Sequence, residues 1–221
     1  PPWSEETRAA RADQDDNVTA TPMKGDVDVT TIVKWLGDTL PDDSIIANGA
    51  GNFSNWVHRF YPYRDYPTEL APQSGSMGYG VPSGVAAKVA MPDRIVVSIN
   101  GDGDFLMCGQ EIATARQYDL DVVFIVINNN TYGTIRMHQE KFYPGRVSGT
   151  DLINPDFAAL ARAYGLHGET VERTEDFAAA FDRCRASGGP SLIELRVEQD
   201  QISPRATLSG LRAAGLETQK T

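Results

Sequence analysis

The feature of this sequence best suited to chemistry is an acid held between two glycines. Asp102 lies between Gly101 and Gly103, shortly after the apolar run at residues 95–99. The β-branched residues of that run favour a buried strand, and the glycines let the backbone turn sharply and approach a ligand closely. Because ligands bind at the carboxyl edge of open α/β sheets, we expect Asp102 to face a binding site.

A second polar group follows the next predicted strand, at residues 122–127. Asn128 and Asn129 end that strand, and residues 104–127, which are 24 positions, separate them from Gly103. This spacing accommodates one crossover helix and one strand, so Asp102 and Asn129 would share a crevice if the two strands are neighbours. A carboxylate, an amide oxygen and a loop carbonyl suit Mg²⁺, which often completes its shell with phosphate oxygens and water.

Backbone N–H groups at the glycines and at the following helix start would reach the same phosphates. The pattern therefore predicts a magnesium–diphosphate site. Each motif alone has a simpler interpretation, since Gly-Asp-Gly is more often a tight turn and paired asparagines are usually loop residues. Their occurrence together, at the ends of consecutive strands, favours the binding site.

The elements that would position these residues follow from the apolar pattern. Helices are predicted at residues 4–13, 28–40, 53–60, 83–90, 106–117, 132–142, 155–164 and 174–186. Strands are predicted at residues 44–47, 95–99, 122–127, 166–171 and 191–197. Asn154 is the predicted cap of the helix at 155–164. Because helices alternate with unbroken apolar strands, we predict an α/β fold, a doubly wound and mostly parallel sheet with helices on both faces.

Composition excludes several classes of function. The chain has 221 residues, 41% of them hydrophobic, and a net charge of −10, which argues against a nucleic-acid surface. Cys108 and Cys184 form no CxxC pair and suit a reducing compartment. No apolar run reaches membrane length and no signal peptide is visible. We therefore expect a cytoplasmic protein that binds neither nucleic acid nor membrane.

The two motifs and the segments around them resemble the thiamine-diphosphate-dependent enzymes. Gly101-Asp-Gly103, the gap of 24 and Asn128-Asn129 match the signature of that family. Residues 75–82, 129–133 and 188–195 are similar to its loop before the binding strand, its metal loop and its closing strand. The resemblance covers about residues 25–200. It is to the C-terminal diphosphate-binding domain of the acetolactate-synthase-like and 2-oxo acid decarboxylase branch.

The resemblance implies a role for individual residues. Asp102, the Asn129 side chain and the Thr131 carbonyl would hold Mg²⁺. Met77, which alone would be interpreted as core filler, would bend the cofactor into its reactive V shape, and the Gly75 carbonyl would accept a hydrogen bond from the aminopyrimidine. The cofactor-binding residues that the resemblance implies are Gly51, Asn52, Phe53, Gly75, Ser76, Met77, Gly101, Asp102, Gly103, Asp104, Asn129, Thr131, Tyr132 and Gly133.

Three further positions deserve separate expectations. Thr134 and His138 match positions that line the substrate pocket in relatives, where His138 would steer a carboxylate or relay a proton. A lone histidine after a loop is more often a surface residue. Asp104 departs from the family pattern, because many relatives carry a small neutral residue there. A second acid beside a diphosphate is unfavourable unless it faces the metal's waters or solvent.

The implied function is a lyase or carboligase acting on a 2-oxo acid, with thiamine diphosphate as the electron sink for loss of CO₂. In this family a glutamate of a preceding domain activates the aminopyrimidine, and no match to it is found here. No catalytic residue is therefore assigned to this chain, and the isolated chain is expected to be inactive. The expected partners are a 2-oxo acid, a pyrimidine-binding domain on the same full-length chain or a partner subunit, and further copies in a homodimer or tetramer.

We divide the chain into three regions. Residues 1–26 are expected to be a helix and linker from a preceding domain, residues 27–200 the thiamine-diphosphate-binding domain, and residues 201–221 a polar, mobile tail with at most a short helix. Since the sequence begins Pro1-Pro2-Trp3 without Met, we expect it to be a piece of a longer protein.

Two other functions stay open. A haloacid-dehalogenase-type Mg²⁺ phosphatase also begins with an Asp-x-Asp motif after a strand, as Asp102-Gly-Asp104 does. Such an enzyme needs a threonine or serine and a lysine at later strand ends, which we do not find, and Asn129 would have no role in it. The remaining alternative is a non-catalytic cofactor-binding or oligomerisation module.

Overall fold

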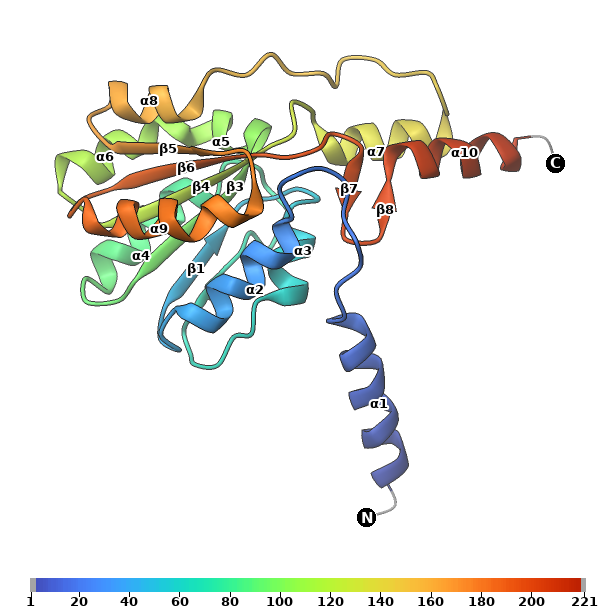
Figure 1. Cartoon of the computed structure of the whole chain (residues 1–221), viewed down its shortest axis with the longest axis horizontal. Helices are drawn as coiled ribbons and strands as arrows, with labels where there is room; N and C mark the ends of the chain where they lie inside the picture. Colours follow the sequence, from blue (N-terminus) through green and yellow to red (C-terminus); the bar gives the residue numbers. More distant parts are fainter. Residues whose placement is uncertain (1–2, 220–221) are drawn as a thin grey trace.

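A computed structural model describes residues 3–219 (Figure 1), and six strands within them form one sheet. Every pairing in the sheet is parallel, in the order β2-β1-β3-β4-β6-β5. The strands are β1 (Ile45–Asn48), β2 (Glu69–Leu70), β3 (Val96–Gly101), β4 (Val122–Asn128), β5 (His167–Val171) and β6 (Ser191–Arg196). The predicted α/β fold with a parallel sheet is confirmed, although β2 lies in a segment for which no strand was predicted.

Helices cover both faces of this sheet, as predicted. One hydrophobic core contains residues of α2 (Val29–Thr39), α3 (Ser54–Phe60) and α9 (Phe177–Ala186). The other contains residues of α4 (Gly80–Ala90), α5 (Asp102–Cys108), α6 (Ile112–Gln117) and α8 (Phe157–Ala163). In Figure 1, α8 lies above the sheet and α9 below it.

The central strand β4 shows why the strands are unbroken apolar runs. Val123, Ile125 and Ile127 pack into the first core, while Val122, Phe124 and Val126 pack into the second. Alternate side chains of a strand point to opposite faces of a sheet. A strand covered by helices on both faces therefore needs apolar residues at every position.

The strand order places a crevice at one edge of the sheet. The chain passes from β1 to the edge strand β2 and then returns to the other side of β1 as β3. Connections that leave two neighbouring strands in opposite directions open a gap between them, and ligands of doubly wound sheets bind there. The loops that follow β1 and β3 meet at this switch point, and the loop after β3 carries Asp102.

Several helix starts differ from the predictions, and α4 begins at Gly80 instead of residue 83. The helix after β3 begins at Asp102 itself and is interrupted by the 3-10 turn η1 (Gly109–Glu111), whereas one helix at 106–117 was predicted. The predicted cap Asn154 is wrong. Asp156 caps α8, because its carboxylate accepts a hydrogen bond of 2.7 Å from the Ala159 N–H.

The N-terminal helix α1 (Ser4–Asn17) extends further than predicted and has no buried residue. Figure 1 shows it projecting away from the body of the domain. Trp3 occupies its N-cap position. Residues 1–2 and 220–221, at the ends of the two predicted terminal regions, lie outside the described residues. No helix of the described chain is both long enough and apolar enough to cross a membrane.

The segment after residue 200 is more structured than the polar tail that was expected. It forms the antiparallel pair β7 (Gln201–Ser203) and β8 (Ala206–Thr207), followed by the helix α10 (Leu208–Thr218). Figure 1 shows α10 beside α7 (Gly133–Phe142). Arg212 of α10 forms an ion pair with the buried Glu140 of α7, which links the two helices.

Candidate functional site

A cavity opens at the switch point, at the carboxyl ends of β1, β3 and β4, and we call it the switch-point cavity. It is bounded by the loop after β1, the start of α5 and the loop after β4. The predicted site residues that line it are Gly51, Asn52, Phe53, Met77, Gly101, Asp102, Gly103, Asp104, Asn129, Thr131, Tyr132, Gly133 and Thr134. Segments distant in sequence thus converge on one hollow.

Three predicted positions do not line the switch-point cavity. Gly75 and Ser76 lie in the neighbouring loop, where Gly75 has a φ of +66° and the Ser76 hydroxyl contacts that of Ser74 at 2.8 Å. His138 lies on α7, where its ring stacks on Phe142 with the ring centroids 5.9 Å apart.

Part of the lining of the switch-point cavity was not predicted from the sequence, and most of these further residues are apolar. The additional lining residues are Met23, Val29, Ala50, Trp56, Ile127, Ile135, Val197, Glu198, Gln201 and Ile202. Ile202 is 1% exposed, and a Cβ added to Gly133 would lie 2.7 Å from its Cδ1 atom. The sequence signal for its burial was weak, a single isoleucine in a polar stretch.

Asp102 is buried at the first turn of α5, with 3% of its surface exposed. Its Oδ1 accepts the Gly103 N–H at 2.8 Å and its Oδ2 accepts the Asn154 amide at 2.7 Å. Burial raises the pKa of Asp102, against the opposing effect of N–H donors from Gly103, Asn154, Asn130 and Thr131. These donors are uncharged, and they do not fully compensate the charged carboxylate for its loss of water. A cation bound at Asp102 would stabilise that charge.

The loop after β4 closes on the same carboxylate. The Asn130 and Thr131 N–H groups are directed at the Asp102 carboxylate and lower its pKa by hydrogen bonding. Asn129 Oδ1 accepts the Thr131 N–H at 3.2 Å, and Asn130 adopts the left-handed region with a φ of +55°. The Thr131 hydroxyl donates to the Thr150 carbonyl at 2.8 Å, which secures the loop from its other side.

The donor set fits a hard cation that is shared with a phosphate. The described residues contain no group of three or more His, Cys, Asp or Glu side chains suited to a metal. A metal ion at Asp102 would therefore depend on amide and carbonyl oxygens from residues 129–131 and on oxygens outside the protein. Oxygen-only coordination with few carboxylates is typical of Mg²⁺ bound to phosphates.

The two glycines around Asp102 are required by close packing. A Cβ at Gly101 would lie 2.8 Å from Cδ1 of the Phe53 ring, and a Cβ at Gly103 would lie 2.5 Å from Cε1 of the Tyr132 ring. Real Cβ atoms essentially never approach so closely. The aromatic walls of the cavity therefore contact bare backbone, which is one of the purposes that glycine serves.

Asp104 faces neither solvent nor the loop after β4. It is 2% exposed, and its Oδ1 accepts the N–H groups of Ala50 at 3.1 Å and Gly78 at 2.8 Å. Burial raises the pKa of Asp104 to about 6. The second acid of the motif thus ties together the loop after β1 and the loop that carries Met77.

Thr134 links α7 to the loop after β1. Its hydroxyl accepts the Asn52 N–H at 3.1 Å and donates to the Asn52 Oδ1 at 2.9 Å. This reciprocal pair uses both hydrogen-bonding functions of the hydroxyl. Thr134 is therefore engaged in holding the cavity wall together.

Comparison with known proteins assigns the domain. Residues 49–195 match the family model described as "Thiamine pyrophosphate enzyme, C-terminal TPP binding domain". The chain is 37% identical over 164 residues to the mitochondrial acetolactate synthase of Schizosaccharomyces pombe, covering 73% of this chain and 24% of that protein. It is 34% identical over 171 residues to the acetolactate synthase isozyme 2 large subunit of Escherichia coli, covering 76% of this chain and 31% of that protein.

A solved structure has the same architecture. The Rhodococcus jostii RHA1 thiamine diphosphate-dependent 4-hydroxybenzoylformate decarboxylase superposes with a TM-score of 0.76 at 32% identity, over 83% of this chain and 35% of that chain. The chain thus spans 24% to 35% of the length of these relatives. The matched residues 49–195 contain β3, β4 and all the predicted residues that line the switch-point cavity. This chain therefore belongs to the thiamine pyrophosphate enzymes, as their C-terminal TPP binding domain, of the acetolactate-synthase-like kind.

Proposed function

We propose that this chain anchors thiamine diphosphate through Mg²⁺ for a lyase or carboligase that acts on a 2-oxo acid. One observation carries the proposal. The switch-point cavity brings the buried carboxylate of Asp102 together with the oxygen-bearing loop of Asn129 and Thr131. That arrangement, in a member of the thiamine pyrophosphate enzyme family, supplies the oxygen donors that a metal–diphosphate group requires.

In this proposal Asp102, Asn129 and the Thr131 carbonyl hold Mg²⁺. The first turn of α5 offers its N–H groups to the diphosphate, where the partial positive charge of the helix dipole favours an anion. Met77, Phe53 and Ile202 exclude water from the apolar side of the cavity. When bound, thiamine diphosphate supplies the electron sink for loss of CO₂.

Catalysis requires a second domain under the same proposal. Because the chain spans only 24% and 31% of two acetolactate synthases, we infer that a pyrimidine-binding domain, on the same full-length chain or on a partner subunit, supplies the activating glutamate. The active protein is then a homodimer or tetramer in the cytoplasm. Purified 221-residue chain should show no steady decarboxylation of a 2-oxo acid such as pyruvate, and sustained turnover by it would contradict this inference.

The decisive experiment is titration calorimetry with thiamine diphosphate. The parent chain should bind in the presence of Mg²⁺ and lose binding when EDTA is added. Asp102→Ala should abolish the metal-dependent binding, whereas Asp38→Ala, an exposed position on α2, should leave it unchanged. Binding that is equally strong with EDTA, or in Asp102→Ala, would rule the proposal out.

The phosphatase alternative loses its support. The family match assigns the domain to thiamine pyrophosphate enzymes, and Oδ1 of Asp104 accepts the amides of Ala50 and Gly78. The non-catalytic alternative is distinguished by activity. Parent chain combined with its pyrimidine-binding domain should decarboxylate a 2-oxo acid, whereas a binding module would take up the cofactor without turnover.

A further inference from the structure

Asn154 reaches Asp102 from the connection between α7 and α8. Its amide nitrogen lies 2.7 Å from Asp102 Oδ2 and 2.8 Å from Asn128 Oδ1. A side-chain amide carries two hydrogens, so these two short contacts use both, while a third oxygen, Asn130 Oδ1, lies farther away at 3.4 Å. The reverse amide orientation would set the Asn154 oxygen against a carboxylate and another amide oxygen. The partners therefore determine which way Asn154 points.

Asn154 does not have the structural role that its place in the chain suggests, which is to cap α8. It comes just before α8, but Asp156 caps that helix. Its own Oδ1 is buried without a hydrogen-bond partner within the described part of the chain. A buried unsatisfied oxygen costs free energy, so this side chain is arranged around its two donor contacts.

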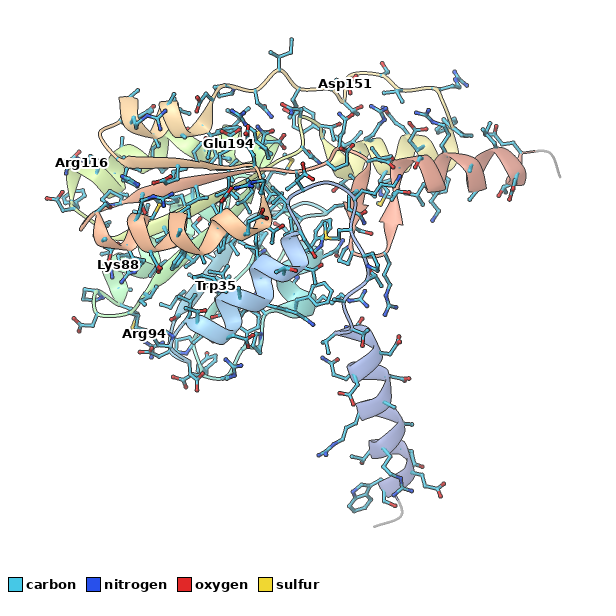
Figure 2. The ribbon with its side chains drawn as sticks, in the orientation of Figure 1. Trp35, Lys88, Arg94, Arg116, Asp151 and Glu194 are labelled. Atoms are coloured by element: carbon cyan, nitrogen blue, oxygen red, sulfur yellow. The ribbon has the colours of Figure 1, made fainter. Side chains whose placement is uncertain are left out.

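The backbone holds Asn154 beside the loop after β4. The Tyr132 N–H donates to the Thr150 carbonyl at 2.9 Å, and the Leu152 N–H donates to the Asn130 carbonyl at 2.9 Å. Thr131 and Asp151 form an antiparallel bridge between these bonds. Asp151 is labelled in Figure 2, on the connection between α7 and α8. The segment of Asn154 is thus fastened to the same loop that closes on Asp102.

The contact continues into a buried polar chain. Asn128 donates through its Nδ2 to Glu194 Oε1 at 2.7 Å, and Glu194 is 1% exposed on β6. Figure 2 labels Glu194 on that strand. Glu194, Asn128, Asn154 and Asp102 therefore form one hydrogen-bonded series across the ends of β6, β4 and β3. A buried network with satisfied donors restricts the geometry of its members.

We propose that Asn154 is a positioning residue for the metal site. It holds the Asp102 carboxylate in a fixed rotation and at a fixed separation from the loop after β4 before any ligand binds. This inference rests on the proposed Mg²⁺–thiamine diphosphate function. Groups that orient a metal ligand in this way usually affect metal affinity about 10- to 100-fold.

The test measures the Mg²⁺ affinity of the 221-residue chain at saturating thiamine diphosphate by calorimetry. Asn154→Ala should raise the Kd for Mg²⁺ by about 10- to 100-fold, while cofactor binding recovers at high Mg²⁺. Asp156→Ala is the matched control. It removes the cap of α8 two residues away, and it should change the Kd less than about 2-fold because it does not touch Asp102.

A second variant and a stability measurement guard against misfolding. Asn154→Ser keeps a polar residue in the segment but is too short to reach Asp102, so it should reproduce the weakened Mg²⁺ binding. Thermal unfolding in EDTA should show both variants folded. A Kd within about 2-fold of the parent in a folded Asn154 variant, or the same loss in Asp156→Ala, overturns this inference alone. Parent chain without Mg²⁺-dependent binding overturns the proposed function, and this inference with it.

Discussion

At the scale of single residues, each of the four residues of the Gly-Asp-Gly-Asp turn has a different role. Asp102 faces the loop after β4, whereas Asp104, two residues later on the same helical turn, faces the opposite loops. Gly101 and Gly103 leave space for aromatic rings. Two acids close in sequence can therefore serve one site without sharing a cation, because the helix directs their side chains to different neighbours.

The space beside Gly103 gives a first prediction. In Gly103→Ala the new Cβ would press on the Tyr132 ring at 2.5 Å, and overpacking of this kind costs about 1–3 kcal/mol. Because Tyr132 lines the cavity, thiamine diphosphate affinity at saturating Mg²⁺ should fall about tenfold. Gly189→Ala, where nothing lies within 4 Å, is the control for calorimetry and should bind like the parent. Equal affinities in all three proteins would contradict the prediction.

The carboxylate of Asp104 gives a second prediction, which concerns stability. Asp104→Ala removes the acceptor of two backbone N–H groups, those of Ala50 and Gly78, and each buried donor left unpaired costs about 1–3 kcal/mol. The free energy of unfolding in urea should therefore fall by about 3 kcal/mol. Asp104→Asn keeps an acceptor oxygen, so its free energy of unfolding should fall clearly less than that of Asp104→Ala. The expectation fails if the alanine and asparagine variants are equally stable.

At the scale of elements, the helix α10 shows how a polar segment becomes part of the fold. Glu140 of α7 is fully buried and accepts hydrogen bonds from Arg136, Gly145 and Arg212. These bonds, chiefly those of Arg212, lower the pKa of Glu140 to about 2. Asp200 and Thr207 position the start of α10 by accepting N–H groups from Ser209 and Gly210. Polar contacts, more than an apolar face, hold α10 against α7.

The ion pair between the two helices predicts a pH dependence. The folded pKa of Glu140 lies below its ordinary value of 4.5, so its contribution to stability is fully present above pH 4.5 and is lost as the pH falls toward 2. Since Arg212 is 45% exposed and solvent screens its charge, we expect this contribution to be about 2 kcal/mol.

Urea unfolding of Glu140→Gln measures that contribution. The variant should be less stable than the parent at pH 7 by about 2 kcal/mol, and the difference should shrink toward pH 3 because Glu140 takes up a proton in the unfolded parent while it stays ionised in the folded one. Glu175→Gln is the control, because Glu175 is 67% exposed and forms only a surface pair. A stability difference that is constant from pH 7 to pH 3 would show that the charge of Glu140 is not responsible.

At the scale of the whole molecule, the cavity is assembled from parts distant in sequence. The loop after β1, the start of α5, the loop after β4 and β7 all reach it. The sheet order brings the first three together, and the packing of the C-terminal segment adds the last. Such a site is formed only by the folded chain, so its ligand should stabilise the whole fold.

Ligand linkage supplies a prediction at this scale. At a cofactor concentration of about 100 times Kd, binding should add about 2.7 kcal/mol to the free energy of unfolding. For a chain of this size, that corresponds to a rise in Tm of about 5–10 °C. The rise should require both thiamine diphosphate and Mg²⁺, and EDTA should remove it. Scanning calorimetry with each component alone is the control, and a full shift with cofactor and EDTA would refute the metal dependence.

The sequence alone determined the fold class and the place of the site. Apolar strands alternating with helices require a parallel sheet covered on both faces, and polar residues that follow consecutive strands must meet at its carboxyl edge. The spacing from Gly103 to Asn128 predicted that Asp102 and Asn129 share one crevice, and both line the switch-point cavity together with Thr131. Their role as metal ligands stays a prediction. These properties depend on periodicity and on local order along the chain, which a sequence displays directly.

Only the tertiary structure decided where the polar side chains point and which remote segments join them. The carboxylate of Asp104 turns to Ala50 and Gly78, the amide of Asn154 turns to Asp102, and Ile202 closes the apolar wall. Asn154 precedes a helix and was therefore predicted to cap it, but a capping residue and a site residue look alike in sequence. Their difference lies in contacts across 52 positions of chain, from Asp102 to Asn154, that only folding brings together.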